Sequence, residues 1–251
     1  MDAAGPGSGA PRAEDRPPLG EPVAPRWDAL RLAITALGSF VAAVLVSTAV
    51  VVALGLRGRP PQERTPEEIL ILAVLSDGAL VLVLFLLGRR LLRVRASDLG
   101  LRRPSVAALA FAALVAGGLW LASIAVNALQ VRALGPNPQS LVVSVGAHSG
   151  PVALLMDLAT GAIVAPFAEE LLYRGLIFGG LAQRVPLGAA AAVSAFLFAL
   201  SHGLGVIAPI FILGLGLAWI YARTGTLWAA MTAHALVNAI SLVLLFVVPR
   251  A

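Results

Sequence analysis

Long, uninterrupted runs of apolar residues dominate the chain from about residue 30 onward. Each run approaches or exceeds the roughly 20 residues that an α-helix needs to cross about 30 Å of hydrocarbon. No segment alternates apolar and polar residues as a transmembrane strand does, and only helices and closed barrels can span lipid. The runs that we expect to be membrane helices are 30–56, 69–87, 106–129, a fourth beginning near 151, 187–200, 204–221 and 227–248.

The fourth run is long enough to be divided. It can extend from Pro151 to Gln183, which at 1.5 Å per residue is about 50 Å of helix and more than a bilayer is thick. Pro166 lacks an amide hydrogen and clashes with the preceding turn, so we expect a kink or break beside it. Glu169 and Glu170 would then begin a new helical piece, where the helix dipole favours carboxylates. The predicted fold class is an all-α, polytopic transmembrane helical bundle with seven or eight membrane-embedded helices.

The composition supports a membrane protein. The hydrophobic residues make up 59% of the chain and the charged residues 12%, with a mean hydropathy of +0.92. Soluble domains have about 45–50% apolar and about 25% charged residues, and surface-to-volume scaling limits how much apolar surface they can bury. Cysteine is absent, which excludes disulfides, thiolate catalysis and cysteine zinc sites. We therefore expect a multi-pass protein of the cell membrane.

The basic residues indicate topology rather than nucleic-acid binding. All of them are arginine, and many lie in short loops between apolar runs. The loop between the second and third runs is the most basic, so we expect it, and with it the N-terminus, on the cytoplasmic side. That loop carries Arg89, Arg90, Arg93, Arg95, Arg102 and Arg103 against Asp98 alone.

The chain divides into a tail and one membrane domain. Residues 1–28 are rich in Ala, Gly and Pro and have no helical or strand period, so we expect a disordered cytoplasmic tail. The tail is too long and too acidic for a secretory signal, so the first apolar run is expected to be retained as a membrane anchor. Residues 29–251 form the predicted transmembrane domain, whose motif-bearing core covers about 151–248.

Charged residues are rare in the C-terminal half. From Ser105 to Ala251 the only acidic residues are Asp157, Glu169 and Glu170. A charged residue at the centre of a membrane helix costs roughly 2.5–3.5 kcal/mol on insertion scales, so such groups persist when they pair or line a polar cavity. Arg174 follows Glu170 by four residues and therefore shares its helix face.

Two further pairs have the same spacing. His202 follows Phe198 by four residues, and Asn238 follows His234 by four, so each pair lies on one face of its helix. Three helices thus each present a polar face within an apolar bundle. The groups offered are carboxylates, a guanidinium, two imidazoles and an amide.

In this order, these motifs resemble the three signature motifs of the CPBP family of intramembrane endopeptidases. The family is also called the CAAX-protease or Abi family and includes the type II CAAX prenyl endopeptidase. The motifs Glu169-Glu170-x-x-x-Arg174, Phe198-x-x-x-His202 and His234-x-x-x-Asn238 cover only the C-terminal third of the chain. The resemblance implies a glutamate-dependent membrane peptidase.

Resemblance and side-chain chemistry together suggest a role for each residue. We expect Glu169 to be the general base that takes a proton from an attacking water, because a carboxylate removed from water is a stronger base. His202 would position and polarise that water. His234 and Asn238 would donate hydrogen bonds to the developing oxyanion.

The supporting residues and a metal ion are further expectations. Glu170 and Arg174 would form an internal ion pair that holds Glu169 in place, and Phe198 would pack beside the site. We favour a site without a metal or other cofactor. Glu169, His202 and His234 are nevertheless a plausible ligand set for zinc. The His234–Asn238 pair could instead be interhelical hydrogen-bond glue.

Two functions other than peptidase fit the same residues. A proton-coupled transporter also uses intramembrane carboxylates and histidines, although the polar residues here are confined to one half of the chain. A non-catalytic peptide-binding or immunity protein could use the same cavity. The expected partners are a peptide or protein terminus at the membrane and the lipid bilayer, without nucleic acid, and the sequence does not set the oligomeric state.

Overall fold

A computed structural model describes residues 27–60, 63–135 and 150–247 of the chain, and within these ranges the only regular secondary structure is helical. Most of the predicted tail therefore lies outside the described residues. At its boundary, Trp27 is buried, and its backbone N–H donates to the side chain of Gln183 at 2.9 Å. Asp28 caps the first helix by accepting from the Arg31 amide.

The helices follow the predicted apolar runs closely. They are α1 (Ala29–Ala53), α2 (Pro66–Leu87), α3 (Val106–Leu134), the pieces α5 (Pro151–Leu158), α6 (Ala165–Glu170) and α7 (Gly179–Leu181), then α8 (Leu187–Ser201), α9 (Ile207–Thr224) and α10 (Leu227–Val247). Local signals set several starts. Thr65 and Glu68 form a reciprocal capping box before α2, and Ser105 caps α3.

Six helical segments of the described chain are long and apolar enough to cross a membrane, and α8 is a shorter apolar helix. Large apolar side chains face outward along them, for example Leu114 and Leu134, each 81% exposed. Such a surface suits hydrocarbon, whereas in water it would drive association. The chain is therefore a multi-pass, all-helical membrane protein, as predicted, and the segments agree with the expected seven or eight.

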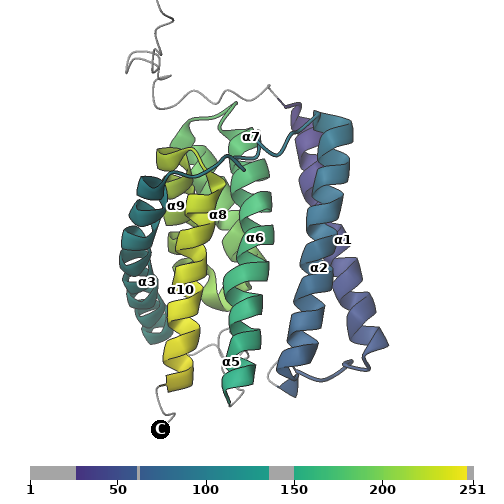
Figure 1. Ribbon diagram of the computed structural model, residues 1–251, viewed down its shortest axis with the longest axis vertical. Helices are drawn as coiled ribbons and strands as arrows, with labels where there is room; N and C mark the ends of the chain where they lie inside the picture. The colour runs from purple at the N-terminus through teal and green to yellow at the C-terminus, as the bar shows by residue number, and fades with distance from the viewer. Residues whose placement is uncertain (1–26, 61–62, 136–149, 248–251) are drawn as a thin grey trace, which may run out of the picture.

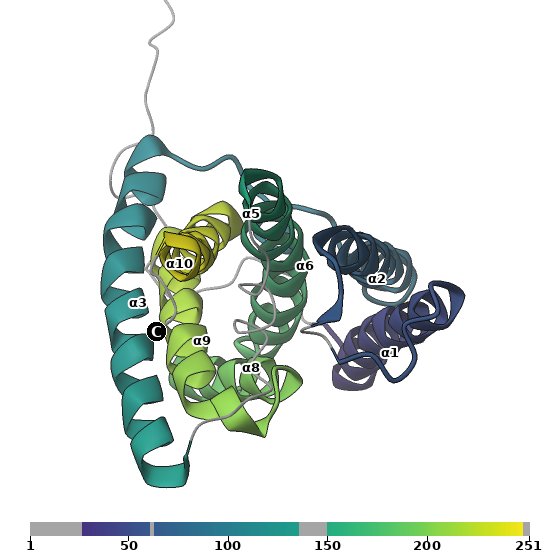
Figure 2. The ribbon, with the colours of Figure 1, turned by 90° about the horizontal axis from the view of Figure 1, so that it is seen from below.

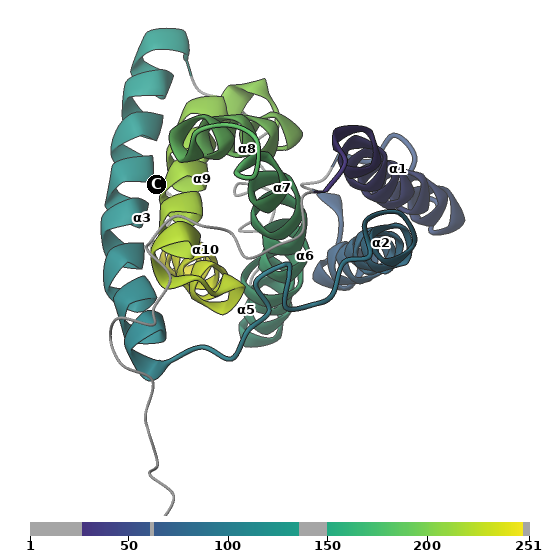
Figure 3. The ribbon, with the colours of Figure 1, turned by 90° about the horizontal axis from the view of Figure 1, so that it is seen from above.

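The helices form three groups (Figure 1). α1 and α2 pair as a hairpin on one side, and α3 packs against α9 and α10 on the opposite side. The views along the long axis show the helix from α5 to α7, together with α8, α9 and α10, between these two layers (Figures 2 and 3). This central group carries all three sequence motifs.

The expected break at Pro166 is wrong. Residues Pro151–Leu181 form one continuous helix, in which the π-helical segments η4 (Ala159–Val164) and η5 (Leu171–Phe178) flank α6. The wider π turn before Pro166 makes room for its ring, so the helix continues past it. Glu169 and Glu170 consequently lie inside a long helix, and a helix dipole does not stabilise them.

The close contact of α8 and α9 depends on Gly214. A Cβ atom at this position would lie 2.9 Å from the Ala195 Cβ and 3.0 Å from the Ala195 Cα. Backbone atoms cannot move aside as a flexible side chain can. A larger residue at position 214 would therefore force the two helices apart.

We predict that Gly214→Ala lowers the thermal unfolding midpoint in detergent micelles. Overpacking of this kind costs about 1–3 kcal/mol. The matched control is Gly118→Ala in α3, where a Cβ would meet nothing within 4 Å and the site is exposed. It should leave the midpoint unchanged or raise it slightly, because Ala is the better helix former. Equal midpoints for Gly214→Ala and the unmodified chain would contradict this account of the α8–α9 contact.

Candidate active site

Polar side chains from three helices meet at Glu169. Its two carboxylate oxygens face different histidines: Oε1 lies 3.5 Å from His202 Nε2, and Oε2 lies 3.7 Å from His234 Nε2. The Glu169 side chain is 22% exposed, whereas that of Glu170 is fully buried. Of the two neighbouring carboxylates, Glu169 is thus the one that another molecule can reach.

The short length of α8 places His202 inside the bundle. Its 15 residues make about 22 Å of helix, less than the hydrocarbon core of a bilayer. His202 caps the C-terminus, and Gly203 then adopts a φ of 93°, a left-handed conformation that glycine tolerates best. The chain turns there through the short 3₁₀-helix η6 (Leu204–Val206) into α9, which leaves the imidazole beside Glu169.

The hydrogen bond of His202 to its own helix fixes its tautomer. His202 Nδ1 lies 2.8 Å from the Phe198 carbonyl oxygen. A carbonyl oxygen can only accept, so Nδ1 carries a proton. In the neutral ring, Nε2 then presents a lone pair towards Glu169.

A buried charge network adjoins Glu169. Arg174 Nη1 donates to Glu170 Oε1 at 2.8 Å, and His234 Nδ1 lies 2.9 Å from the same oxygen. Arg174 also donates through Nη2 to the Gly214 carbonyl oxygen at 3.1 Å, which ties the network to α9. The side chains of Glu170 and Arg174 are fully buried and His234 is 3% exposed. Glu170 thereby orients the imidazole whose other nitrogen faces Glu169.

Phe198 connects these groups through its ring. The Arg174 guanidinium carbon lies 4.4 Å from the ring centroid, a cation–π geometry. The rings of Tyr173, His202 and His234 meet the Phe198 ring edge to face, with centroids 5.2, 4.6 and 5.6 Å away. The expected packing position thus contacts members of all three motifs.

Asn238 follows His234 on α10 and contacts a different part of the facing helix. Its Nδ2 donates to the Gly161 carbonyl oxygen at 2.7 Å. Within the π segment, Ala165 donates to Thr160, and Pro166 has no N–H to offer, so this carbonyl lacks a helical donor. Asn238 therefore bonds a backbone acceptor that the π turn and the proline leave open. This bond has the character of interhelical glue.

Asp77 was not among the site residues predicted from the sequence. This residue lies in α2, in the N-terminal half that carries no motif, and it lines a cavity together with Ala168, the neighbour of Glu169. Its signal was present in the sequence, since a lone acidic residue inside an apolar run is by default a functional candidate.

The spacing of possible metal ligands in the described residues bears on the zinc alternative. No three His, Cys, Asp or Glu side chains in that part of the chain gather closely enough to hold a metal ion. The two histidines near Glu169 each face a separate oxygen of its carboxylate.

Comparisons with known proteins bear on the same segment. Residues 151–240 match a family model described as Type II CAAX prenyl endopeptidase Rce1-like. The chain is also similar to the Bacillus subtilis (strain 168) protein named "Putative membrane peptidase YdiL", with 26% identity over 129 residues. This match spans 48% of the chain and 53% of that protein, which is about half of its length. No solved structure matches the chain.

The family match includes Glu169, Glu170, Arg174, Phe198, His202, His234 and Asn238. The comparisons therefore confirm that residues 151–240 carry the sequence pattern of the type II CAAX prenyl endopeptidase family.

Proposed function

We propose that the protein is an intramembrane endopeptidase that cleaves membrane-associated peptides or protein termini with a water activated by Glu169. One observation carries the proposal. A partly exposed carboxylate within a membrane helix lies between the Nε2 atoms of two histidines that arrive on separate helices. The family match over the same residues supports peptide hydrolysis over the transporter and the immunity-type alternatives.

In the proposed reaction, Glu169 removes a proton from water while the water oxygen bonds to the peptide carbonyl carbon. The C–N bond then breaks, and the proton held by Glu169 passes to the leaving amine. The lone pair of His202 Nε2 accepts the second hydrogen of the water and so orients it. The Glu169–histidine distances are somewhat longer than hydrogen bonds, as is common at catalytic sites without substrate.

The oxyanion requires donors. In this proposal, the contact of Nδ1 with Glu170 orients the His234 ring, and Nε2 is the atom directed towards the reacting carbonyl as a donor. Asn238 has two amide hydrogens and uses one for the Gly161 carbonyl. In this proposal, the second hydrogen remains for the oxyanion.

Glu170 and Arg174 are positioning residues in this scheme. Both are fully buried and paired, so neither is available to a substrate. Their contribution is the orientation of His234 and of the helix that carries Glu169.

The proposed orientation follows from the arginine-rich loop between α2 and α3. This loop is anchored to the start of α10, because the Leu227 amide donates to the Gly100 carbonyl oxygen and the Thr226 hydroxyl donates to the Arg102 carbonyl oxygen. We place this end of the bundle, and the N-terminal end of α1, on the cytoplasmic side.

Glu169→Gln should lower the cleavage rate by about 10²–10⁴-fold, because the amide cannot accept the proton of the water. The measurement is mass spectrometry of new peptide termini after purified protein in liposomes is incubated with membrane protein extract. The matched control is Glu63→Gln, an exposed acid before α2, which should cleave like the unmodified protein. Full proteolysis by a folded Glu169→Gln variant would refute the proposal.

Neutralising one member of the buried ion pair should destabilise the protein. Glu170→Leu or Arg174→Met alone leaves an unpaired buried charge, at a cost of about 3–5 kcal/mol. The double variant should regain more than half of the lost unfolding free energy, as measured by denaturation in micelles. Its cleavage rate should stay low, because His234 has lost the acceptor for Nδ1. A double variant as unstable as the sum of the single variants would show that the pair does not act as a unit.

We further propose that hydrolysis needs no metal ion. Incubation with 1,10-phenanthroline or EDTA, followed by dialysis, should leave the cleavage rate within about twofold of the untreated rate, since Glu169 is the proposed base. Loss of activity that added zinc restores would instead assign Glu169, His202 and His234 as metal ligands.

A further inference from the structure

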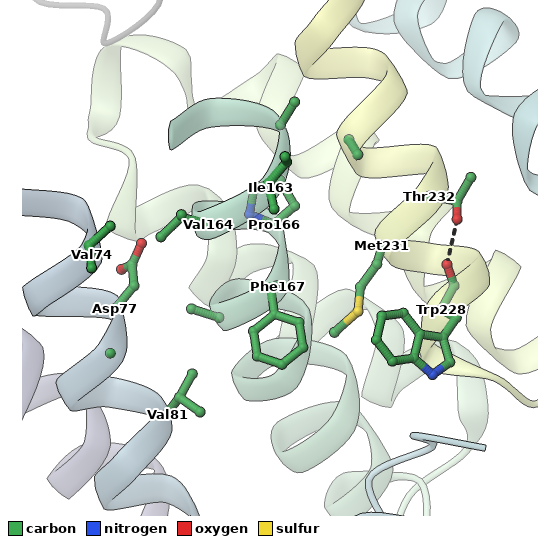
Figure 4. Close-up of a pocket in the computed structure, with 14 residues that line it drawn as sticks. Val74, Asp77, Val81, Ile163, Val164, Pro166, Phe167, Trp228, Met231 and Thr232 are labelled. Atoms are coloured by element: carbon green, nitrogen blue, oxygen red, sulfur yellow. Dashed lines mark hydrogen bonds between the residues drawn. The ribbon is translucent and has the colours of Figure 1, made fainter. Parts of the chain in front are cut away.

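A second feature lies beside the proposed site: a cavity of about 520 Å³ between α2, the helix around Pro166 and α10 (Figure 4). This volume is within the range of small-ligand pockets, about 300–1,000 Å³. Its walls are mostly apolar and include Val74, Val81, Ile163, Phe167, Trp228 and Met231. Ala168 also lines it, so the cavity reaches the residue next to Glu169.

Within the part of the chain that the structure describes, Asp77 is the only ionisable side chain that lines the cavity. It is partly exposed, and its carboxylate makes no hydrogen bond or ion pair with the described part of the chain. A side-chain hydroxyl also lies in the wall, that of Thr232, and it already donates to the Trp228 carbonyl oxygen at 2.8 Å. The cavity therefore offers one free charged group.

A carboxylate without a countercharge is unusual at the position of Asp77 in α2. Asp77 follows Pro66 by eleven residues, so it lies about 16 Å along a helix that is able to cross the membrane. Ionisable groups at such a depth normally pair with an opposite charge. Glu169, which follows the cavity-lining Ala168, is an acid of the same sign, while Glu170 is already paired with Arg174. A bound cation would supply the countercharge that Asp77 lacks.

Aromatic rings add a second feature that favours cations. The Phe167 and Trp228 rings both line the cavity, with centroids 6.4 Å apart and planes tilted by 43°. Their helices face α2, which carries Asp77 (Figure 4). Aromatic faces attract organic cations, whereas a metal ion would need more oxygen ligands than this wall supplies. A carboxylate, ring faces and apolar walls suit a cationic head on an aliphatic stem, as in lysine and arginine.

We propose that this cavity is a specificity pocket that binds a basic side chain of the peptide substrate, with Asp77 pairing with its cationic head. The proposal rests on the endopeptidase function above and adds the class of substrate to it. Because the cavity adjoins Glu169, the basic residue lies near the bond that is cleaved. Peptides with lysine or arginine at that position are cleaved in preference to neutral ones.

The test compares lysine with norleucine, which keeps the aliphatic stem and lacks the charge. A peptide with a cleavage site found in the terminus analysis is made with lysine or norleucine at each position in turn. The wild-type protein should prefer lysine at one position by about tenfold or more in kcat/KM, on the order of what a desolvated charge pair contributes. Asp77→Asn should reduce this ratio to near one, because the asparagine amide carries no charge to pair with lysine.

Two further variants serve as controls for charge and for substitution. Asp77→Glu keeps the charge and should keep a preference for lysine. Asp98→Asn makes the same change in the loop between α2 and α3, outside the cavity, and should behave like the wild-type protein. An equal lysine preference in Asp77→Asn and the wild-type protein, or no preference at any position, would overturn the proposal.

A binding measurement separates the pocket from the catalytic proposal. Fluorescence anisotropy in micelles would compare labelled lysine and norleucine peptides on Glu169→Gln and on Glu169→Gln/Asp77→Asn. The pocket predicts at least about tenfold tighter binding of the lysine peptide, lost when Asp77 is replaced. If no peptide is cleaved but this difference is found, the endopeptidase proposal fails and the pocket stands. If peptides are cleaved but the lysine peptide binds no more tightly than the norleucine peptide, the pocket proposal fails.

Discussion

The cost of holding charge inside a lipid-embedded helix bundle governs the centre of this protein. Glu170 and Arg174 are fully buried, and they neutralise each other across one helical turn. The hydrogen bond of Arg174 to the Gly214 carbonyl and the contact of His234 with Glu170 extend this pair to α9 and α10. A pair that is expensive to separate thus sets the relative positions of three helices, and Glu169 occupies the partly exposed edge of the same cluster.

A second constraint comes from Pro166. A proline inside a membrane helix removes a hydrogen-bond donor. In lipid, the carbonyl that is left unpaired cannot hydrogen-bond to water instead. The π turn before Pro166 shifts the pairing, and Asn238 supplies the missing donor to Gly161. The helix therefore stays continuous and carries Glu169 at a fixed height opposite α10. The same residue that resembles a catalytic amide also completes the backbone of the facing helix.

The α1–α2 hairpin forms one wall of the cavity beside the proposed site. α2 packs against α1 on one side and approaches the helix from α5 to α7 on the other, and the cavity with Asp77 lies along this second contact. The motif-bearing core supplies the proposed chemistry, whereas the N-terminal hairpin supplies one wall of the neighbouring cavity and its carboxylate, Asp77. In the proposed enzyme, catalysis and selection of the peptide thus come from different parts of the chain.

The sequence by itself determined the membrane location and the approximate number and limits of the helices, and it supplied the residues that are proposed for the site. Long apolar runs have few alternatives in lipid, and spacings of four residues place Glu170 with Arg174 and His234 with Asn238 on single helix faces. Only the tertiary structure decided which groups meet. Glu169 faces His202 and His234, while Asn238 faces Gly161, because the short α8 and the crossing of α10 set these distances. The local sequence pattern could not predict the continuous helix at Pro166 either. The donor that replaces the missing N–H comes from Asn238, which lies far along the chain. The tertiary structure also decided that Asp77 lies beside the proposed site, because proximity across helices is set by packing and no local spacing encodes it.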